Sequence, residues 1–255
     1  MNKALLTSNK EVASYSANEV FFCPEESQFY SQCLENMVLS RCTHNDLVVE
    51  FGSGEGAPVI NSLLKNKFES IIHGYELNSA ACKLARSRIK QYQLKDKYVI
   101  HNQCFFQRAP NHASYLIANP PYLPAPDDDL YMPSLHGGTD GATITKRLIA
   151  IGYNNVLLMI SAYSNPVETV NYAIAQGYQV VDFMLSPLKF GYYRIAEKFS
   201  GILFSKYLFS CRCFTQKERC SSSRLVRRIV KSNDCFISSH AKLITYFQQA
   251  FIAYS

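Results

Sequence analysis

The sequence predicts an α/β fold: a doubly wound, Rossmann-like sheet of seven strands whose last strand runs antiparallel to the others. Short apolar runs rich in β-branched residues alternate with amphipathic, helix-like segments, a pattern typical of parallel sheets covered by helices on both faces. After the last of these helices two strand-like runs follow with no helix between them, so they can pair as an antiparallel hairpin. The 255 residues, 47% of them hydrophobic, suffice for one large domain with a substantial core.

Each expected element begins and ends at a local sequence signal. A first helix is expected over 26–42, because apolar residues recur there at helical spacing. Asn78 or Ser79 can cap a helix over 79–92, and Gly177 can end a helix over 166–178 that has proline in its first turn. Strands are expected over 46–54, 70–76, 98–105, 114–119, 155–161, 179–185 and 200–207, and further helices over 57–65 and 141–151.

A glycine-rich turn, VVEFGSGEGAP, follows the first strand and contains Gly52, Gly54 and Gly56. Glycines between a strand and a helix let a ligand approach the backbone closely. The G-x-G-x-G spacing differs from the dinucleotide pattern G-x-G-x-x-G, so a ligand without pyrophosphate is favoured. Glu76 ends the second strand, where a carboxylate can bind both ribose hydroxyls. Because Glu50 adds an acid that suits sulfonium and ammonium groups, the turn predicts S-adenosylmethionine (SAM) as cofactor.

The fourth expected strand ends at Asn119, in the segment LIANPPYLPAP. The Asn119 side-chain carbonyl and the Pro120 backbone carbonyl can both accept hydrogen bonds from one NH2 group, and proline has no N–H to compete. Tyr122 can stack on the planar group that carries this NH2. We therefore expect Asn119, Pro120 and Tyr122 to be catalytic residues for methylation of an amide or nucleobase amine, aligned without a strong general base. The structural alternative is a tight Pro-Pro turn capped by Asn119.

Together, EFGSGEG, ELN and NPPY resemble the class I SAM-dependent methyltransferases of the HemK type, which include protein-glutamine methyltransferases. The segments VFFCPEESQF, HGGTDGATITKRLI and RIAEKFSGILFSKY resemble further parts of that family, so the resemblance covers residues 19–208. It implies SAM-dependent N-methylation, with Asn119 binding the substrate amide and Glu76 the ribose. The cofactor contacts that it implies in addition come from Glu26, Gln28, Glu50, Gly52, Ser53, Gly54, Gly56, Leu77 and Cys104.

The chain departs from this family in three respects. The stretch before the first strand is too short for the helical substrate-docking domain of bacterial release-factor methyltransferases. Cys104 stands where the family usually has an acid near the adenine amine, and Ser27-Gln28 replaces an Asp-Thr pair. We therefore expect weaker or differently arranged cofactor binding. Eukaryotic relatives need a small zinc-binding activator subunit, so a partner of this kind is an open alternative here.

Charge divides the chain into parts. From residue 209 onward eight Lys or Arg stand against two acids, a net charge of +6, whereas the first 208 residues hold 18 of each sign. We expect a disordered N-terminus (1–18), a SAM-dependent methyltransferase domain (19–208) and a basic C-terminal appendage (209–255). The neutral domain argues against a duplex DNA substrate, and the basic appendage favours contact with RNA.

Several methyl acceptors stay open. A glutamine side-chain amide of a protein or peptide is favoured, and the exocyclic amine of adenine in RNA or DNA and a small molecule are alternatives. A further alternative is that the chain is a non-catalytic protein with the SAM-binding fold. Nine cysteines and no secretion signal argue against a disulfide framework, and Cys211-x-Cys213 lacks the usual zinc spacing, so no metal site is expected. No apolar run is long enough to cross a bilayer, so we expect a cytoplasmic protein without a membrane partner.

Overall fold

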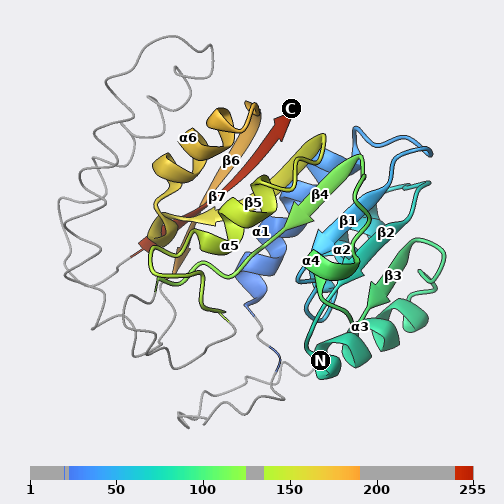
Figure 1. Cartoon of the computed structure of the whole chain (residues 1–255). Coiled ribbons are helices and arrows are strands. Elements are labelled where there is room, and N and C mark those ends of the chain that lie inside the picture. Colours follow the sequence, from blue (N-terminus) through green and yellow to red (C-terminus); the bar gives the residue numbers. More distant parts are fainter. Residues whose placement is uncertain (1–19, 21–22, 125–134, 190–244, 255) are drawn as a thin grey trace, which may run out of the picture.

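The computed structural model of the chain describes residues 20, 23–124, 135–189 and 245–254 (Figure 1). Its centre is a parallel sheet of five strands in the order β3-β2-β1-β4-β5. These strands are β1 (Val48–Phe51), β2 (Ile72–Tyr75), β3 (Tyr98–His101), β4 (Tyr115–Ala118) and β5 (Asn155–Ser161). The order reverses between β1 and β4, which is where doubly wound sheets bind ligands. The parallel sheet confirms the predicted Rossmann-like fold.

Helices cover both faces of the sheet. On one face lie α1 (Pro24–Leu34), α2 (Ala57–Lys65) and α3 (Ser79–Gln91), and on the other α4 (Phe105–Arg108), α5 (Thr143–Ile149) and α6 (Pro166–Ala175). Figure 1 shows α5 in front of the sheet and α1 behind it. Two buried clusters, one against each face, form the core because β1, β4 and β5 place buried apolar side chains on both sides of the sheet.

Local signals explain most helix boundaries. Asn78 caps α3, since its side-chain oxygen accepts hydrogen bonds from the backbone N–H groups of Ala80 and Ala81 at 2.9 and 3.2 Å. Proline occupies the first turns of α1, α2 and α6, where its missing N–H costs nothing. The helix expected over 26–42 is α1 followed by one wider π-helical turn, η1 (Glu35–Leu39), and a short 3-10 turn, η3 (Ala162–Ser164), follows β5.

The third expected strand is shorter than predicted. The expectation was 98–105, but β3 ends at His101 and Phe105 begins the single turn α4. Phe105 is buried and packs edge-on against the rings of Phe51 and Tyr75, which draws this segment onto the face of the sheet. Cys104 therefore lies at the N-terminal boundary of α4 and not on a strand.

The far side of the sheet is completed by β6 (Gln179–Lys189) and β7 (Thr245–Tyr254). β7 lies between β5 and β6 and pairs antiparallel with both. It comes from the segment that the sequence analysis assigned to the basic appendage. The strand expected over 200–207, the expected disordered residues 1–18 and the basic part of the appendage lie outside the described residues.

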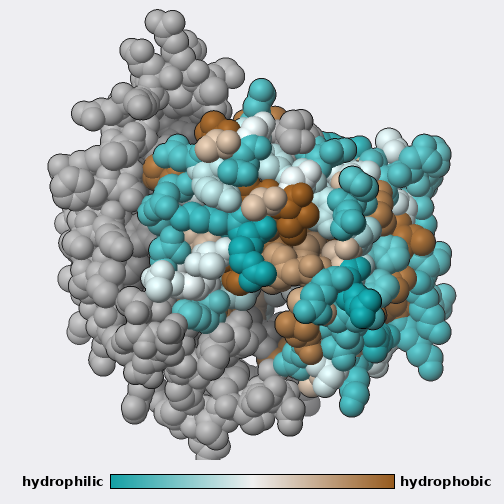
Figure 2. Space-filling view, viewed as in Figure 1, coloured by the Kyte–Doolittle hydropathy of each residue, from teal (hydrophilic) through white to brown (hydrophobic). Residues whose placement is uncertain are grey.

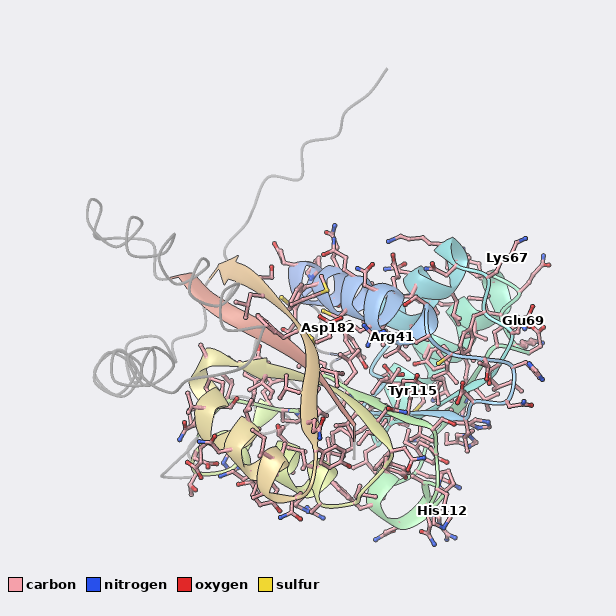
Figure 3. The ribbon with its side chains drawn as sticks, turned by 90° about the horizontal axis from the view of Figure 1, so that it is seen from above. Arg41, Lys67, Glu69, His112, Tyr115 and Asp182 are labelled. Carbon is pink, nitrogen blue, oxygen red and sulfur yellow. The ribbon has the colours of Figure 1, made fainter. Side chains whose placement is uncertain are left out.

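The face of the described residues seen in Figure 2 is largely polar. Figure 2 shows hydrophilic side chains over much of this face, with smaller hydrophobic patches between them. Within the described residues, no helix combines the length and the apolar character that a membrane crossing requires. Arg41, which follows η1, lies beside Asp182 of β6 (Figure 3), and their side chains form an ion pair at 2.8 Å.

Candidate active site

The strand register aligns four polar or glycine positions at one edge of the sheet. Phe51 pairs with both Tyr75 and Ala118, and Tyr75 pairs with His101. The residues that directly follow these strand ends therefore lie in a row, about 4.8 Å apart between neighbouring strands. They are Asn102, Glu76, Gly52 and Asn119. This row confirms that the glycine turn and the asparagine turn meet at the same edge.

The glycine turn has a backbone that other residues rarely adopt. Gly52, Gly54 and Gly56 all have positive φ, at 67°, 53° and 76°. A Cβ added to Gly52 or Gly54 would meet no atom within 4 Å, so these two glycines border open space. At Gly56 an added Cβ would lie 3.2 Å from the Tyr98 ring, so this glycine serves close packing at the start of α2. The open space above Gly52 and Gly54 fits a ligand that lies on the backbone.

Glu76 is held rigidly beside this turn. Its two carboxylate oxygens accept hydrogen bonds from the backbone N–H groups of Gly54 at 2.9 Å and Asn78 at 2.7 Å. Each oxygen keeps acceptor capacity, as a carboxylate has about four lone-pair positions. The next residue, Leu77, is 71% exposed. A fixed carboxylate followed by an exposed apolar side chain is suited to a ribose and the planar base attached to it.

Asn102 is a residue that the sequence analysis missed. Its side-chain amide donates to the backbone carbonyls of Glu76 at 2.9 Å and Leu77 at 3.1 Å, and so fixes the turn after β2. The sequence contains a signal for this role, because Asn102 directly follows an apolar strand, as Asn119 does. Cys104, two residues later, is partly buried at the start of α4, and Gln28 is exposed on α1.

Glu50 and Ser53 are turned away from the open side of the turn. Glu50 is 1% exposed, and its carboxylate accepts hydrogen bonds from the hydroxyl groups of Tyr98 and, at 3.5 Å, Tyr30. Burial raises the pKa of Glu50 to about 8, against the opposing effect of the Tyr98 hydrogen bond. Ser53 is buried, with its Cβ close to Gly74. The side chains of both residues lie in the core beneath the glycine turn.

The asparagine turn is held from two sides. The Asn119 amide donates from Nδ2 to Glu26 Oε1 at 2.8 Å, and the Tyr122 hydroxyl donates to Glu26 Oε2 at 3.2 Å. Pro120, which follows Asn119 in the chain, is buried. Beyond Tyr122, Leu123 exchanges backbone hydrogen bonds with Leu135 and Gly137 at 3.0 and 2.9 Å. Asn119, Pro120 and Tyr122 thus belong to one loop that is held by hydrogen bonds. The sequence resemblance implied that Glu26 contacts the cofactor, and in the structure Glu26 contacts this loop.

A cavity of about 250 Å³ lies at the opposite edge of the sheet, where the strands begin. Leu47, His112 (labelled in Figure 3) and Tyr153 are among its lining residues. Parallel sheets bind ligands at the carboxyl ends of their strands, so we take the row, and not this cavity, as the candidate active site. Among the described residues, no group of three or more His, Cys, Asp or Glu side chains could hold a metal ion.

Comparison with known proteins gives the fold of SAM-dependent methyltransferases. No protein-family signature and no curated protein sequence matches the chain. A proposed RNA methyltransferase from Pyrococcus horikoshii superimposes with a TM-score of 0.55 at 11% identity, covering 97% of this chain and 91% of that one. A SAM-dependent methyltransferase from Geobacter sulfurreducens, solved with S-adenosylhomocysteine (SAH), has a TM-score of 0.48 at 14% identity, covering 91% and 90%.

A third similar structure is the Mtq2–Trm112 complex of E. cuniculi, which methylates the translation termination factor eRF1. It has a TM-score of 0.47 at 18% identity and covers 67% of this chain and 91% of that chain. The similarity to the Pyrococcus horikoshii structure, over nearly the whole length of both chains, shows that this chain has the class I methyltransferase fold.

Proposed function

We propose that this chain is a SAM-dependent N-methyltransferase of the HemK type, which methylates a planar NH2 nitrogen and acts on a glutamine side-chain amide of a protein. The observation that carries the proposal is the position of Asn119 in the row, one strand away from Gly52. A site for a nucleoside ligand and a site for an amide thus adjoin, as a methyl transfer between them requires.

The residues present fit SAM. Open space above Gly52 and Gly54 accommodates a ligand without phosphates, the fixed carboxylate of Glu76 suits the ribose, and exposed Leu77 suits the adenine. When bound, SAM supplies an electrophilic methyl group on a sulfonium. Glu50 supports the turn from behind through the two tyrosine hydroxyls, and so acts on the cofactor only through the backbone.

The asparagine turn would prepare the acceptor nitrogen. An amide or aromatic NH2 is a poor nucleophile because its lone pair is delocalised, so the site must align it and stabilise the charge that develops. The Asn119 side-chain carbonyl and the Pro120 backbone carbonyl can accept one N–H each. These two oxygens would stabilise the positive charge that develops on the acceptor nitrogen as it receives the methyl group, until one of its protons leaves to water. Tyr122 would flank the planar group.

RNA is the second candidate substrate, because the net charge of +6 lies in residues 209–255 while the rest of the chain is neutral. The exocyclic amine of adenine offers the same NH2 geometry as an amide. The proposed function involves no membrane partner.

We also propose that a small activator subunit takes part, as the resemblance to eukaryotic HemK-type enzymes implies. Adding such a subunit to the assay tests this.

One assay tests the function: the chain is incubated with SAM labelled in its methyl group and with cell lysate, and the products are then treated with nuclease or protease. Label that survives nuclease but not protease identifies a protein substrate, and the reverse result identifies a nucleic acid. Asn119→Ala should lower the transfer rate by about a hundredfold, since one such stabilising group contributes this much, while SAH affinity measured by calorimetry stays close to that of the wild type. Undiminished transfer by Asn119→Ala would contradict the mechanism.

A further inference from the structure

Glu26 occupies an unusual place for a carboxylate. It lies in the first turn of α1 and is only 2% exposed, although an uncompensated buried charge is costly. Its two oxygens are bound separately: Oε1 accepts from Asn119 Nδ2 at 2.8 Å, and Oε2 accepts from the Tyr122 hydroxyl at 3.2 Å. The first turn of a helix also favours a negative charge. One carboxylate therefore links two of the three residues of the asparagine turn.

This contact determines which end of the Asn119 amide faces the site. Glu26 Oε1 accepts a hydrogen bond from Asn119 Nδ2, so it binds the NH2 end of the amide, whereas the carbonyl end has no hydrogen to donate. With Nδ2 directed at Glu26, the carbonyl oxygen of Asn119 is directed away from it. A side-chain amide without such a partner could present either end to a substrate. The acceptor geometry proposed for methyl transfer depends on this orientation.

A second contact on α1 fixes the position of Glu26. Tyr30 lies four residues later, on the same side of the helix, and its hydroxyl donates to Glu50 at 3.5 Å. Ser31 adds a hydrogen bond from Oγ to the Pro58 carbonyl of α2 at 2.8 Å. These contacts attach α1 to β1 and α2, so the Glu26 carboxylate is held by a packed helix and not by a loop.

We propose that Glu26 is a positioning residue of the methyl-transfer site, which orients the Asn119 amide with its carbonyl toward the acceptor nitrogen and holds the Tyr122 hydroxyl. This inference rests on the proposed function and replaces the cofactor role that the sequence resemblance implied for Glu26. A positioning residue acts through Asn119, so its removal should slow transfer without weakening cofactor binding. A cofactor residue would do the opposite.

The test compares Glu26→Gln with Glu25→Gln, which makes the same charge change one residue away at an exposed position of the same turn. In Glu26→Gln we expect SAH affinity by calorimetry to stay within about twofold of the wild type, while the rate of labelled methyl transfer at saturating SAM falls by about tenfold or more. Glu26→Asp keeps an acceptor-only group and should recover part of the rate. Glu25→Gln should behave as the wild type in both measurements.

A second readout does not depend on catalysis. The Asn119 side-chain NH2 resonances, assigned in an amide NMR spectrum by their loss in Asn119→Ala, should shift in Glu26→Gln and stay unchanged in Glu25→Gln. Unshifted resonances in Glu26→Gln, an unchanged transfer rate, or a loss of SAH affinity of about tenfold would each overturn the positioning role. If instead the wild type neither binds SAH nor transfers methyl groups, the proposed function fails, and the NMR comparison still decides whether Glu26 orients Asn119.

Discussion

At the scale of single residues, Glu50 shows how a residue of the glycine motif can be tied into the core of the fold. Val48 and Glu50 point to the same face of β1, because side chains alternate along a strand, and that face is covered by helices. A carboxylate placed there is dehydrated, so burial raises the pKa of Glu50 to about 8, and burial likewise raises the pKa values of Tyr30 and Tyr98. Near neutral pH the group is largely protonated in the folded protein.

The raised pKa of Glu50 predicts a stability that falls with pH. From the ordinary value of 4.5 up to about 8, the folded state holds a proton that the unfolded state has lost. The free energy of unfolding should therefore decrease through this range, by up to roughly 1.4 kcal/mol per pH unit from this one group. Glu50→Gln removes the titration and keeps an acceptor for the tyrosines, so its decrease should be shallower. Urea unfolding at pH 5.5 and pH 8 measures the difference.

The exposed residue Glu69 gives the matched control for this measurement, since Glu69→Gln changes the same charge without burial. Its stability should follow the wild-type pH dependence. Histidines that titrate in the same range contribute equally to all three proteins and cancel in the comparison. Parallel pH dependences of wild type and Glu50→Gln would show that Glu50 is not protonated in the fold.

The glycine turn allows a second comparison at this scale. Gly54→Ala and Gly56→Ala each place an L-residue at positive φ, which costs about 1–2 kcal/mol of stability. At Gly54 the added methyl enters open space, so we expect this stability cost and a loss of SAH affinity of about tenfold or more. At Gly56 the methyl meets Tyr98, Ala85 and Ile60, so the stability loss should be larger. Urea unfolding and calorimetry separate the two effects, and wild-type SAH affinity of Gly54→Ala would show that no ligand approaches this backbone.

At the scale of elements, the sequence predicted the five parallel strands and the helices between them, because each combines a periodic apolar pattern with a cap or glycine at its end. It misjudged the segment after His101, since Phe105 and Phe106 suit a strand as well as a helix. Packing of Phe105 against Phe51 and Tyr75 decides the outcome, and that contact joins distant parts of the chain. Local propensity could not show it.

The start of α3 provides a prediction for a single element. Asn78 caps the helix through two backbone N–H groups, and its own N–H binds the Glu76 carboxylate. Asn78→Ala should lower the free energy of unfolding by about 1 kcal/mol, as is typical for the loss of a cap. Asn78→Ser keeps a capping oxygen and should retain most of the stability. Equal stability of the Ala and Ser variants in urea unfolding would contradict the capping role.

At the scale of the whole molecule, the candidate site could be predicted only where it follows from topology. The strand order brings Gly52, Glu76 and Asn119 to one edge, and this follows from the doubly wound pattern alone. The contact between Glu26 and Asn119 joins residues 93 positions apart and depends on how α1 packs against one face of the sheet. No periodicity or spacing in the sequence predicts that placement, so only the structure shows that Glu26 holds the asparagine turn.

The C-terminal strand leads to the last prediction. β7 is paired on both sides, so its backbone N–H groups serve the ladders to β5 and β6, and proline within it would remove such a bond. Gln249 pairs with Ile160 on one side and Leu185 on the other. Gln249→Pro should therefore destabilise the protein by on the order of 3 kcal/mol more than Gln249→Ala, which keeps the backbone N–H. If urea unfolding finds both variants equally stable, residues 245–254 do not belong to the sheet and form part of the appendage that the charge distribution suggested.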